Sequence, residues 1–174
     1  GRHESLRTRF PAAAGEPRQE ILADFVPALT VDDLTALAEA ELEQRMAEIA
    51  TAEARTPFDL AAAPPVRYRL LLGSDSAVLL ATLHHIVTDG WSTDIFVREL
   101  RTAYAAFRNG GEPDLPELAV QYADYALWQR EFLRGEIRER QLAYWRRELD
   151  GAVHSISLPY DFPRPAQLSW QGGM

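Results

Sequence analysis

Residues 84–90, with the sequence His-His-Ile-Val-Thr-Asp-Gly, hold two imidazoles, a carboxylate and a glycine in one short segment. An imidazole is the side chain best suited to proton transfer near neutral pH, and a carboxylate can orient it. The segment follows the apolar run 77–83, which predicts a buried strand, and a helical pattern starts at Ser92. Strand-to-helix turns of α/β proteins expose reactive side chains on a rigid support. The pattern therefore indicates a candidate active site.

The two adjacent histidines are expected to have different surroundings. Neighbouring residues at the end of a strand point to opposite faces, so His84 and His85 are poorly placed to ligate one metal ion together. We expect one buried, hydrogen-bonded imidazole and one imidazole presented to a cavity. His3 and His154 are distant and carry no ligand spacing, and the chain has no cysteine. The sequence therefore predicts no metal site and excludes disulfides and thiolate catalysis.

The residues that follow the histidines leave several roles open. Asp89 could contact His85, orient the turn or pair with an arginine. Gly90 suits a positive φ angle or the close approach of a ligand, and its N–H could serve as a donor. Ser92 is near enough to be a nucleophile, but serine at the start of a helix is far more often an N-cap. Spacing alone supports catalysis and a structural role about equally.

Composition places the chain among globular proteins. It has 174 residues, of which 47% are hydrophobic and 25% charged. All 18 basic residues are arginine, which excludes a Schiff-base lysine and the lysine of a phosphate-binding loop. The net charge of −8 argues against nucleic acid as the main partner. No apolar run approaches the ~18 residues of a membrane span, and no signal peptide is evident, so we expect a cytoplasmic location.

The elements that position residues 84–90 can be predicted from the spacing of apolar residues and from the residues that mark turns and helix ends. Strands are expected over Val66–Leu72 and Ala77–Leu83, joined as a hairpin by a turn at 73–76. The helix after the turn is expected to begin at Ser92 or Thr93 and to end at residues 109–111, Asn-Gly-Gly. The other predicted elements are a loop over 11–20, a strand over 21–26, a helix from the N-cap Thr30 to Arg55 with Asp32 and Asp33 in its first turn, helices over 122–133 and 136–149, and extended coil over the last 20 residues.

Four segments of the chain together resemble a known family. Residues 84–92, HHIVTDGWS, are similar to the HHxxxDG motif of condensation domains in nonribosomal peptide synthetases. Residues 2–10, RHESLRTRF, resemble the family's RHExLRTxF motif, and residues 122–129, YADYALWQ, resemble its YxDYAxWQ motif. Tyr144-Trp145 with residues 158–165, LPYDFPRP, resemble its YW…LPxDxPRP segment. The segments occur in the family's order and cover nearly the whole chain.

The resemblance implies a fold and an extent. The family has a chloramphenicol-acetyltransferase-like fold of two pseudo-symmetric lobes, an α/β class that we expect here as an α+β arrangement of two layers. Residues 1–174 are expected to form the N-terminal lobe. The family's first strand and its C-terminal lobe are expected to lie outside this sequence, so we expect the isolated lobe to be inactive.

The resemblance also assigns roles to residues. The second histidine, His85, lies at the centre of the family's tunnel, where an acceptor amine attacks a donor thioester, either as a base or as a positioning group. His84 is the buried partner. Asp89 is the structural aspartate, for which Arg2 is the expected arginine partner and Arg67 the second choice. Further residues implied at the substrate channel are Gly90, Trp91 and Ser92, the last two as in the subtype that joins L-configured donors to L-configured acceptors.

The resemblance implies partners and leaves two alternatives. Substrates arrive on the phosphopantetheine of donor and acceptor peptidyl carrier proteins, no cofactor is bound by the domain itself, and an adenylation domain is adjacent. One alternative is a relative with other chemistry, an epimerisation domain or an acyltransferase that uses a coenzyme A thioester. The other is a non-catalytic recruitment module, and relatives of that kind usually lose one of the two motif histidines, which are both present here.

Overall fold

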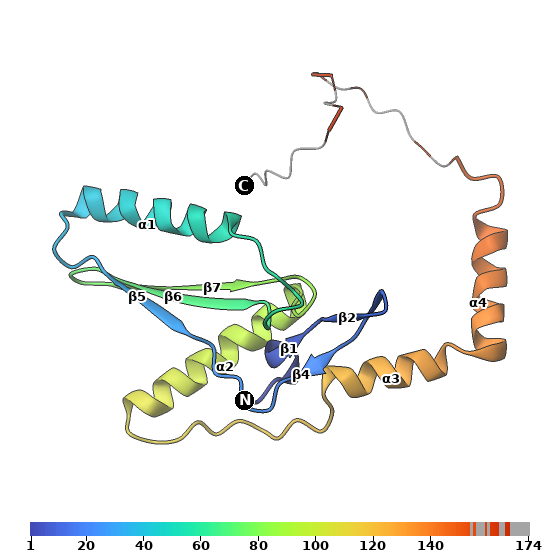
Figure 1. Cartoon of the computed structure of the whole chain (residues 1–174), viewed down its shortest axis with the longest axis horizontal. Helices are drawn as coiled ribbons and strands as arrows, with labels where there is room; N and C mark the ends of the chain where they lie inside the picture. The colour runs from blue at the N-terminus through green and yellow to red at the C-terminus, as the bar shows by residue number, and fades with distance from the viewer. Residues whose placement is uncertain (154, 156–158, 160, 164–165, 168–174) are drawn as a thin grey trace. The chain divides into compact units, whose positions relative to one another are not determined.

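A computed structural model describes residues 1–153, 155, 159, 161–163 and 166–167 (Figure 1). The chain forms two compact units, Gly1–Gln129 and Arg130–Met174. The turn at residues 84–90 lies wholly within the first unit, so the first unit contains the elements that position the candidate site.

The centre of the first unit is a three-stranded sheet. Its strands are β5 (Leu29–Asp33), β6 (Val66–Leu72) and β7 (Ala77–Leu83), in the order β5-β6-β7. β6 and β7 are antiparallel with Leu72 opposite Ala77, which confirms the predicted hairpin and its bounds. β5 is parallel to β6. Parallel neighbours need a crossover connection, and helix α1 (Glu39–Arg55) supplies it.

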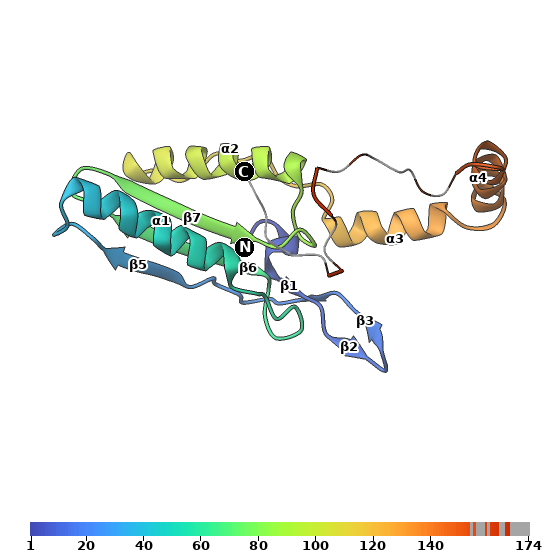
Figure 2. The same cartoon turned by 90° about the horizontal axis from the view of Figure 1, so that it is seen from above.

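Helices cover both faces of this sheet. Tyr68 of β6 stacks on Phe96 of helix α2 (Gly90–Arg108), with ring centroids 6.2 Å apart, whereas the adjacent Arg67 contacts Glu53 of α1. Because alternate residues of a strand point to opposite faces, α1 and α2 lie on opposite sides of the sheet (Figures 1 and 2). The mixed α/β class is confirmed, with one more helical layer than the two layers expected. The fully buried Leu71 lies on the α1 side.

The predicted helix start at Thr30 is wrong, because Leu29–Asp33 is strand β5 and α1 begins only at Glu39. One tertiary contact and one local contact explain the difference. The Asp32 carboxylate accepts two hydrogen bonds from Arg69 of β6, at 2.5 and 2.8 Å, which holds β5 in the sheet. The Asp33 carboxylate then accepts hydrogen bonds from the backbone N–H and the hydroxyl of Thr35 and turns the chain out of the strand. The predicted helix end at Arg55 is confirmed.

The N-terminal segment is a folded hairpin rather than a loop followed by a strand. After the short helix η1 (Glu4–Arg7), β1 (Thr8–Arg9) pairs with β4 (Glu20–Ile21), and β2 (Ala12–Ala13) pairs with β3 (Glu16–Pro17). Ala14 and Gly15 join β2 and β3 with positive φ angles of 54° and 83°, the conformation of a tight hairpin turn. The predicted strand over 21–26 is therefore wrong beyond Ile21, and half of the predicted loop over 11–20 lies in paired strands.

Two helices complete the described part of the chain. Helix α3 (Tyr122–Phe132) and helix α4 (Gly135–Glu148) confirm the predicted helices to within a residue at each end. The expected terminal coil and the LPxDxPRP segment fall mostly on residues 154, 156–158, 160, 164–165 and 168–174, outside the described residues. None of the described helices combines the length and the apolar character needed to cross a membrane.

Candidate active site

The His-His-Asp-Gly segment forms the connection between β7 and α2. β7 ends at Leu83 and α2 begins at Gly90, so residues 84–89 make the turn (Figure 1). The backbone N–H of His84 donates to the Pro65 carbonyl at 3.0 Å, and the N–H of Val87 donates to the His84 carbonyl at 3.0 Å. The turn is thereby tied to the start of β6 on one side and closed on itself on the other.

The His84 imidazole stabilises the turn. Its Nδ1 accepts a hydrogen bond from the backbone N–H of Ile86 at 3.0 Å. In the neutral ring, this bond leaves the proton on Nε2. The Phe58 ring meets the His84 ring edge to face, with centroids 6.0 Å apart and an interplanar angle of 81°. His84 is half-buried and hydrogen-bonded, so it corresponds to the imidazole that was expected to be held by the fold.

The His85 side chain is exposed, in contrast to its neighbour. The structure thus places the two adjacent imidazoles in different surroundings, as the alternation of side chains at a strand end requires. Among the described residues, no group of three or more His, Asp or Glu side chains is arranged to bind a metal ion. The arrangement can offer one imidazole to a substrate, for proton transfer or as a hydrogen-bond partner.

Asp89 is the N-cap of α2. Its Oδ1 accepts hydrogen bonds from the backbone N–H of Ser92 at 2.8 Å and from the Ser92 hydroxyl at 2.6 Å, and its backbone carbonyl accepts from Thr93. The Ser92 hydroxyl, its N–H and the nearby charge of His85 hold the pKa of Asp89 below its ordinary value. The predicted N-cap role of Ser92 or Thr93 is therefore wrong, because the aspartate just before the helix binds the free N–H groups first.

Arg2 does not pair with Asp89. Its Nε donates to Glu99 of α2 at 3.1 Å, and its Nη2 donates to the Pro116 carbonyl. The second choice, Arg67, contacts Glu53 instead. The expected Arg–Asp89 pair is thus absent among these residues, since the Asp89 carboxylate is occupied by the local cap at the start of α2 and Arg2 reaches the same helix at its third turn.

Arg2 and His3 attach the N-terminal segment to α2 through one carboxylate. His3 Nε2 lies 2.7 Å from the second oxygen of Glu99, whose side chain is 15% exposed. Burial raises the pKa of Glu99, but the hydrogen bonds and charges of His3 and Arg2 outweigh it and the net pKa is lowered. Gln121 adds two hydrogen bonds, donating to the Arg2 carbonyl and accepting from the Glu4 N–H. The motif at residues 2–10 therefore braces the helix that follows the turn.

The other residues predicted at the site have distinct positions. Gly90 is the first residue of α2, its φ is not positive, and a Cβ added there would meet no atom within 4 Å. Space for a close approach, rather than backbone conformation, is thus its distinguishing property. Trp91 is 82% exposed. The Ser92 hydroxyl donates a hydrogen bond to Asp89 Oδ1 and thereby takes part in the cap of α2.

A cavity of about 370 Å³ lies beside the turn, on the side of α2 that faces the sheet. It is lined by apolar side chains of α2, by Tyr68 of β6, by Val87 and Thr88 of the turn, and by residues of the N-terminal segment that are mostly polar, such as Arg2 and His3. Neither His84 nor His85 is among the residues that line it. The exposed imidazole therefore does not line this cavity.

Sequence reasoning missed Phe58 beside His84, and it gave Arg67 a different partner. Phe58 contacts the His84 ring, and the guanidinium of Arg67 lies over the Phe58 ring, 3.9 Å from its centroid. Phe58 follows Pro57, a residue type that in sequence signals only the end of a helix. An aromatic residue in the segment between the end of α1 and β6, the strand that pairs with β7, is a signal that could have pointed to this contact.

The chain belongs to the condensation domain family, whose model matches residues 1–174. It is 46% identical over 177 residues to the dimodular nonribosomal peptide synthase of Bacillus subtilis, covering 98% of this chain and 7% of that protein. It is 42% identical over 172 residues to phosphinothricin tripeptide synthetase PhsC of Streptomyces viridochromogenes, covering 98% of this chain and 16% of that protein. The chain thus spans a small part of the synthetases that it matches.

Solved structures of related domains share this fold, which is chloramphenicol-acetyltransferase-like. The X-domain from teicoplanin biosynthesis is 37% identical, with a TM-score of 0.77 over 95% of this chain and 36% of that one. The epimerization domain from the third module of tyrocidine synthetase B is 27% identical, with a TM-score of 0.79 over 93% of this chain and 36% of that one. The chain therefore spans about a third of each solved domain.

Proposed function

We propose that residues 1–174 form the N-terminal lobe of a condensation domain that makes peptide bonds between thioesters bound to carrier proteins. One observation carries the proposal: His85 is exposed at the turn, while His84 and Asp89 are held in local hydrogen bonds. The family match over the whole chain and the likeness to peptide synthetases support it. The solved domains of this fold are longer, and this chain covers about a third of each.

The proposed reaction joins an amine to an acyl group. The nitrogen of an acceptor aminoacyl thioester attacks the carbonyl carbon of the donor thioester. A C–N bond forms, the C–S bond breaks, and the proton lost by the nitrogen ends on the departing thiolate. An imidazole nitrogen of His85 accepts a hydrogen bond from the attacking amine, and it either takes that proton or orients the lone pair of the nitrogen. Trp91 and Ser92 lie at the mouth of the substrate channel.

The proposed partners follow from this reaction. Donor and acceptor peptidyl carrier proteins deliver the two thioesters on phosphopantetheine arms, and an adenylation domain of the same synthetase loads the acceptor. The domain itself needs no further cofactor for acyl transfer to an amine, because the thioester carbonyl is already activated. The cytoplasmic location is part of the same proposal.

Incubation of the complete protein with loaded donor and acceptor carrier proteins tests this function. Mass spectrometry of the acceptor carrier should show a new amide that carries the donor residue. Inversion of the donor residue without amide formation would favour epimerisation, a chemistry found in a solved structure with the same fold. Acyl transfer from a coenzyme A thioester would favour that class of acyltransferase. Binding of carriers without any new product would favour a recruitment module.

Loss of the Asp89 cap should lower both stability and activity. We expect Asp89→Ala to lower the melting temperature by about 2–8 °C, because the first turn of α2 then lacks an acceptor for its N–H groups. Turnover should fall as well, because the turn that bears His85 loosens. Differential scanning calorimetry and the amide assay measure the two effects.

Two variants separate the cap from a chemical role of Asp89. Asp89→Asn keeps the capping oxygen and should restore most of the stability and turnover. Asp94→Ala, which removes an exposed aspartate from the same helix, should change neither. Full stability of Asp89→Asn with turnover as low as that of Asp89→Ala would mean that the carboxylate charge acts on the reaction itself.

Gly90→Ala should test whether the open space beside residue 90 matters for turnover without changing the fold of the turn. The added methyl meets no atom within 4 Å, and alanine favours a helix, so the melting temperature should stay equal or rise. Turnover should fall roughly tenfold if the acceptor passes close to this backbone. Gly111→Ala, just beyond the other end of α2, also has room and serves as the matched control. Unchanged turnover in Gly90→Ala would remove Gly90 from the channel.

A further inference from the structure

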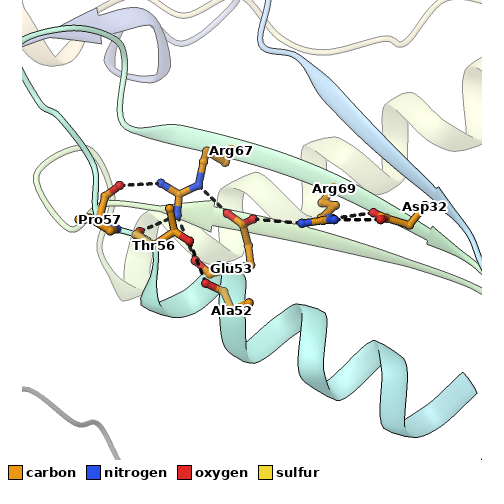
Figure 3. Close-up of polar contacts among 7 residues, drawn as sticks. All are labelled: Asp32, Ala52, Glu53, Thr56, Pro57, Arg67 and Arg69. Carbon is orange, nitrogen blue, oxygen red and sulfur yellow. Dashed lines mark hydrogen bonds and ion pairs between the residues drawn. The ribbon is translucent and has the colours of Figure 1, made fainter. Parts of the chain in front are cut away.

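Arg67 of β6 binds the C-terminal end of α1 with all three of its guanidinium nitrogens (Figure 3). Its Nε donates to the Glu53 carboxylate at 2.5 Å. Its Nη2 donates to the backbone carbonyls of Glu53 and Thr56 at 3.0 and 2.8 Å, and its Nη1 donates to the carbonyl of Pro57 at 3.3 Å. The last carbonyls of a helix lack partners within the helix, so this guanidinium fixes the point at which the chain leaves α1.

The same guanidinium lies over an aromatic ring. Its central carbon is 3.9 Å from the centroid of the Phe58 ring, and a cation at this distance is attracted to the face of the ring. Phe58 follows Pro57 directly, so Arg67 holds this residue by both the backbone before it and the ring itself. Both side chains are partly buried, which limits the screening of this contact by water.

Phe58 in turn contacts the first histidine of the active-site motif. Its ring meets the His84 ring at an angle of 81°, and His84 Nδ1 accepts a hydrogen bond from Ile86 within the turn. The His84 ring is therefore fixed by a contact from inside the turn and by a contact from the segment that Arg67 holds. Rotation of this ring would free the Ile86 N–H and change the backbone that carries His85.

We infer that Arg67 is a positioning residue for the active-site turn, acting through Phe58 on His84 and so on the orientation of His85. The inference rests on the proposed function of His85. Its physical basis is that a displacement of about 1 Å at a reacting group can cost a large factor in rate. Phe58 is the second member of this chain of contacts and shares the same role.

Arg69 provides a matched comparison. It lies two residues along β6 on the same face, and its guanidinium binds the Asp32 carboxylate at 2.5 and 2.8 Å and lies 4.0 Å from Glu53 (Figure 3). Arg69 thus belongs to the same network of charges, but its direct hydrogen bonds go to β5 rather than to the segment before β6. Its loss should weaken the sheet without moving the His84 ring.

The experiment compares Arg67→Met, Arg69→Met and Phe58→Leu in the complete protein, labelled with ¹³C and ¹⁵N on histidine. Arg67→Met and Phe58→Leu should shift the ring signals of His84 and lower kcat roughly 10-fold to 100-fold, with a smaller change in KM for the acceptor carrier. Arg69→Met should lower the melting temperature but leave the His84 signals in place and kcat within about twofold, measured well below its melting temperature.

Equal losses of kcat in Arg67→Met and Arg69→Met, or unmoved His84 signals in Arg67→Met, would overturn the inference and leave Arg67 as a helix cap alone. Arg67→Lys, which keeps the charge over the ring, should retain more activity than Arg67→Met and provides a folded variant if the methionine variant does not fold. The NMR signals need no turnover, so they report on positioning even if the protein makes no amide and the proposed function fails.

Discussion

Replacement of His85 by alanine is expected to lower peptide-bond formation by the complete protein by about 10²–10⁴-fold, the range in which positioned acid–base groups contribute. His85 is exposed at the turn, and the other polar groups of the motif are engaged in holding the turn. Single-turnover assays with loaded donor and acceptor carriers, followed by mass spectrometry of the acceptor, measure the loss. The melting temperature should stay unchanged, since the removed side chain is exposed.

A glutamine variant distinguishes the two roles open to His85. His85→Gln keeps a side chain that can bind the amine by a hydrogen bond, but its amide cannot take up a proton near neutral pH. Substantial activity of the glutamine variant, with an inactive alanine variant, would assign positioning; loss in both would assign proton transfer. His3→Ala changes a histidine that binds Glu99 and serves as a comparison for loss of stability alone. Unchanged amide formation in His85→Ala would contradict the proposed function.

Residues 1–174 expressed alone are expected to give no detectable amide with the same carriers. The solved domains of this fold are longer, the chain covering 36% of the teicoplanin X-domain and of the tyrocidine epimerization domain. An imidazole exposed to water lacks the enclosed surroundings in which a hydrogen bond to the reacting amine is strengthened. Product from the isolated chain, above the background set by His85→Ala, would show that one lobe suffices.

The isolated chain should also associate with itself. Several large apolar side chains are strongly exposed in the described part of the chain, including Trp91 at 82%, Tyr104 at 68%, Leu127 at 68% and Val120 at 62%. Exposed apolar surface of this kind favours association in water. Size-exclusion chromatography with light scattering should give a mass above that of the monomer at micromolar concentration. The complete protein, measured in the same way, is the reference in which these side chains are expected to be buried.

The hairpin and the end of α2 were predictable because their signals are local. An apolar run, a short polar turn and a second apolar run predict β6 and β7 with correct bounds. Residues 109–111 predict the end of α2, where Gly110 has a φ of 75°. The strand at Leu29–Asp33 was missed because the contact that keeps it in the sheet joins Asp32 to Arg69, far along the chain. Its Thr and Asp residues equally suit the start of a helix.

The candidate site likewise has features that the sequence predicted and features that it did not. The spacing of His85, Asp89 and Gly90, together with the other segments that resemble the family, was sufficient to identify the family and the turn. The partner of Arg2 was not predictable, because Asp89 and Glu99 are both carboxylates on or beside one helix. A capping bond within three residues costs little chain entropy to form, so it occupies Asp89, and Arg2 binds the carboxylate that the folded N-terminal segment reaches.

The sequence by itself determined the condensation domain family, the β6–β7 hairpin, the ends of α1 and α2, the helices α3 and α4, and the position of the turn at residues 84–90, since each depends on residue types at short spacing. The resemblance already named His84 as the buried partner and His85 as the histidine presented to substrate; only the tertiary structure showed which contacts hold His84, namely the Ile86 N–H and the Phe58 ring. The Phe58 ring contacts His84, and the guanidinium of Arg67 lies over the Phe58 ring. These contacts join segments that pattern analysis treats separately, because they form only when β6 brings the end of α1 next to the turn after β7.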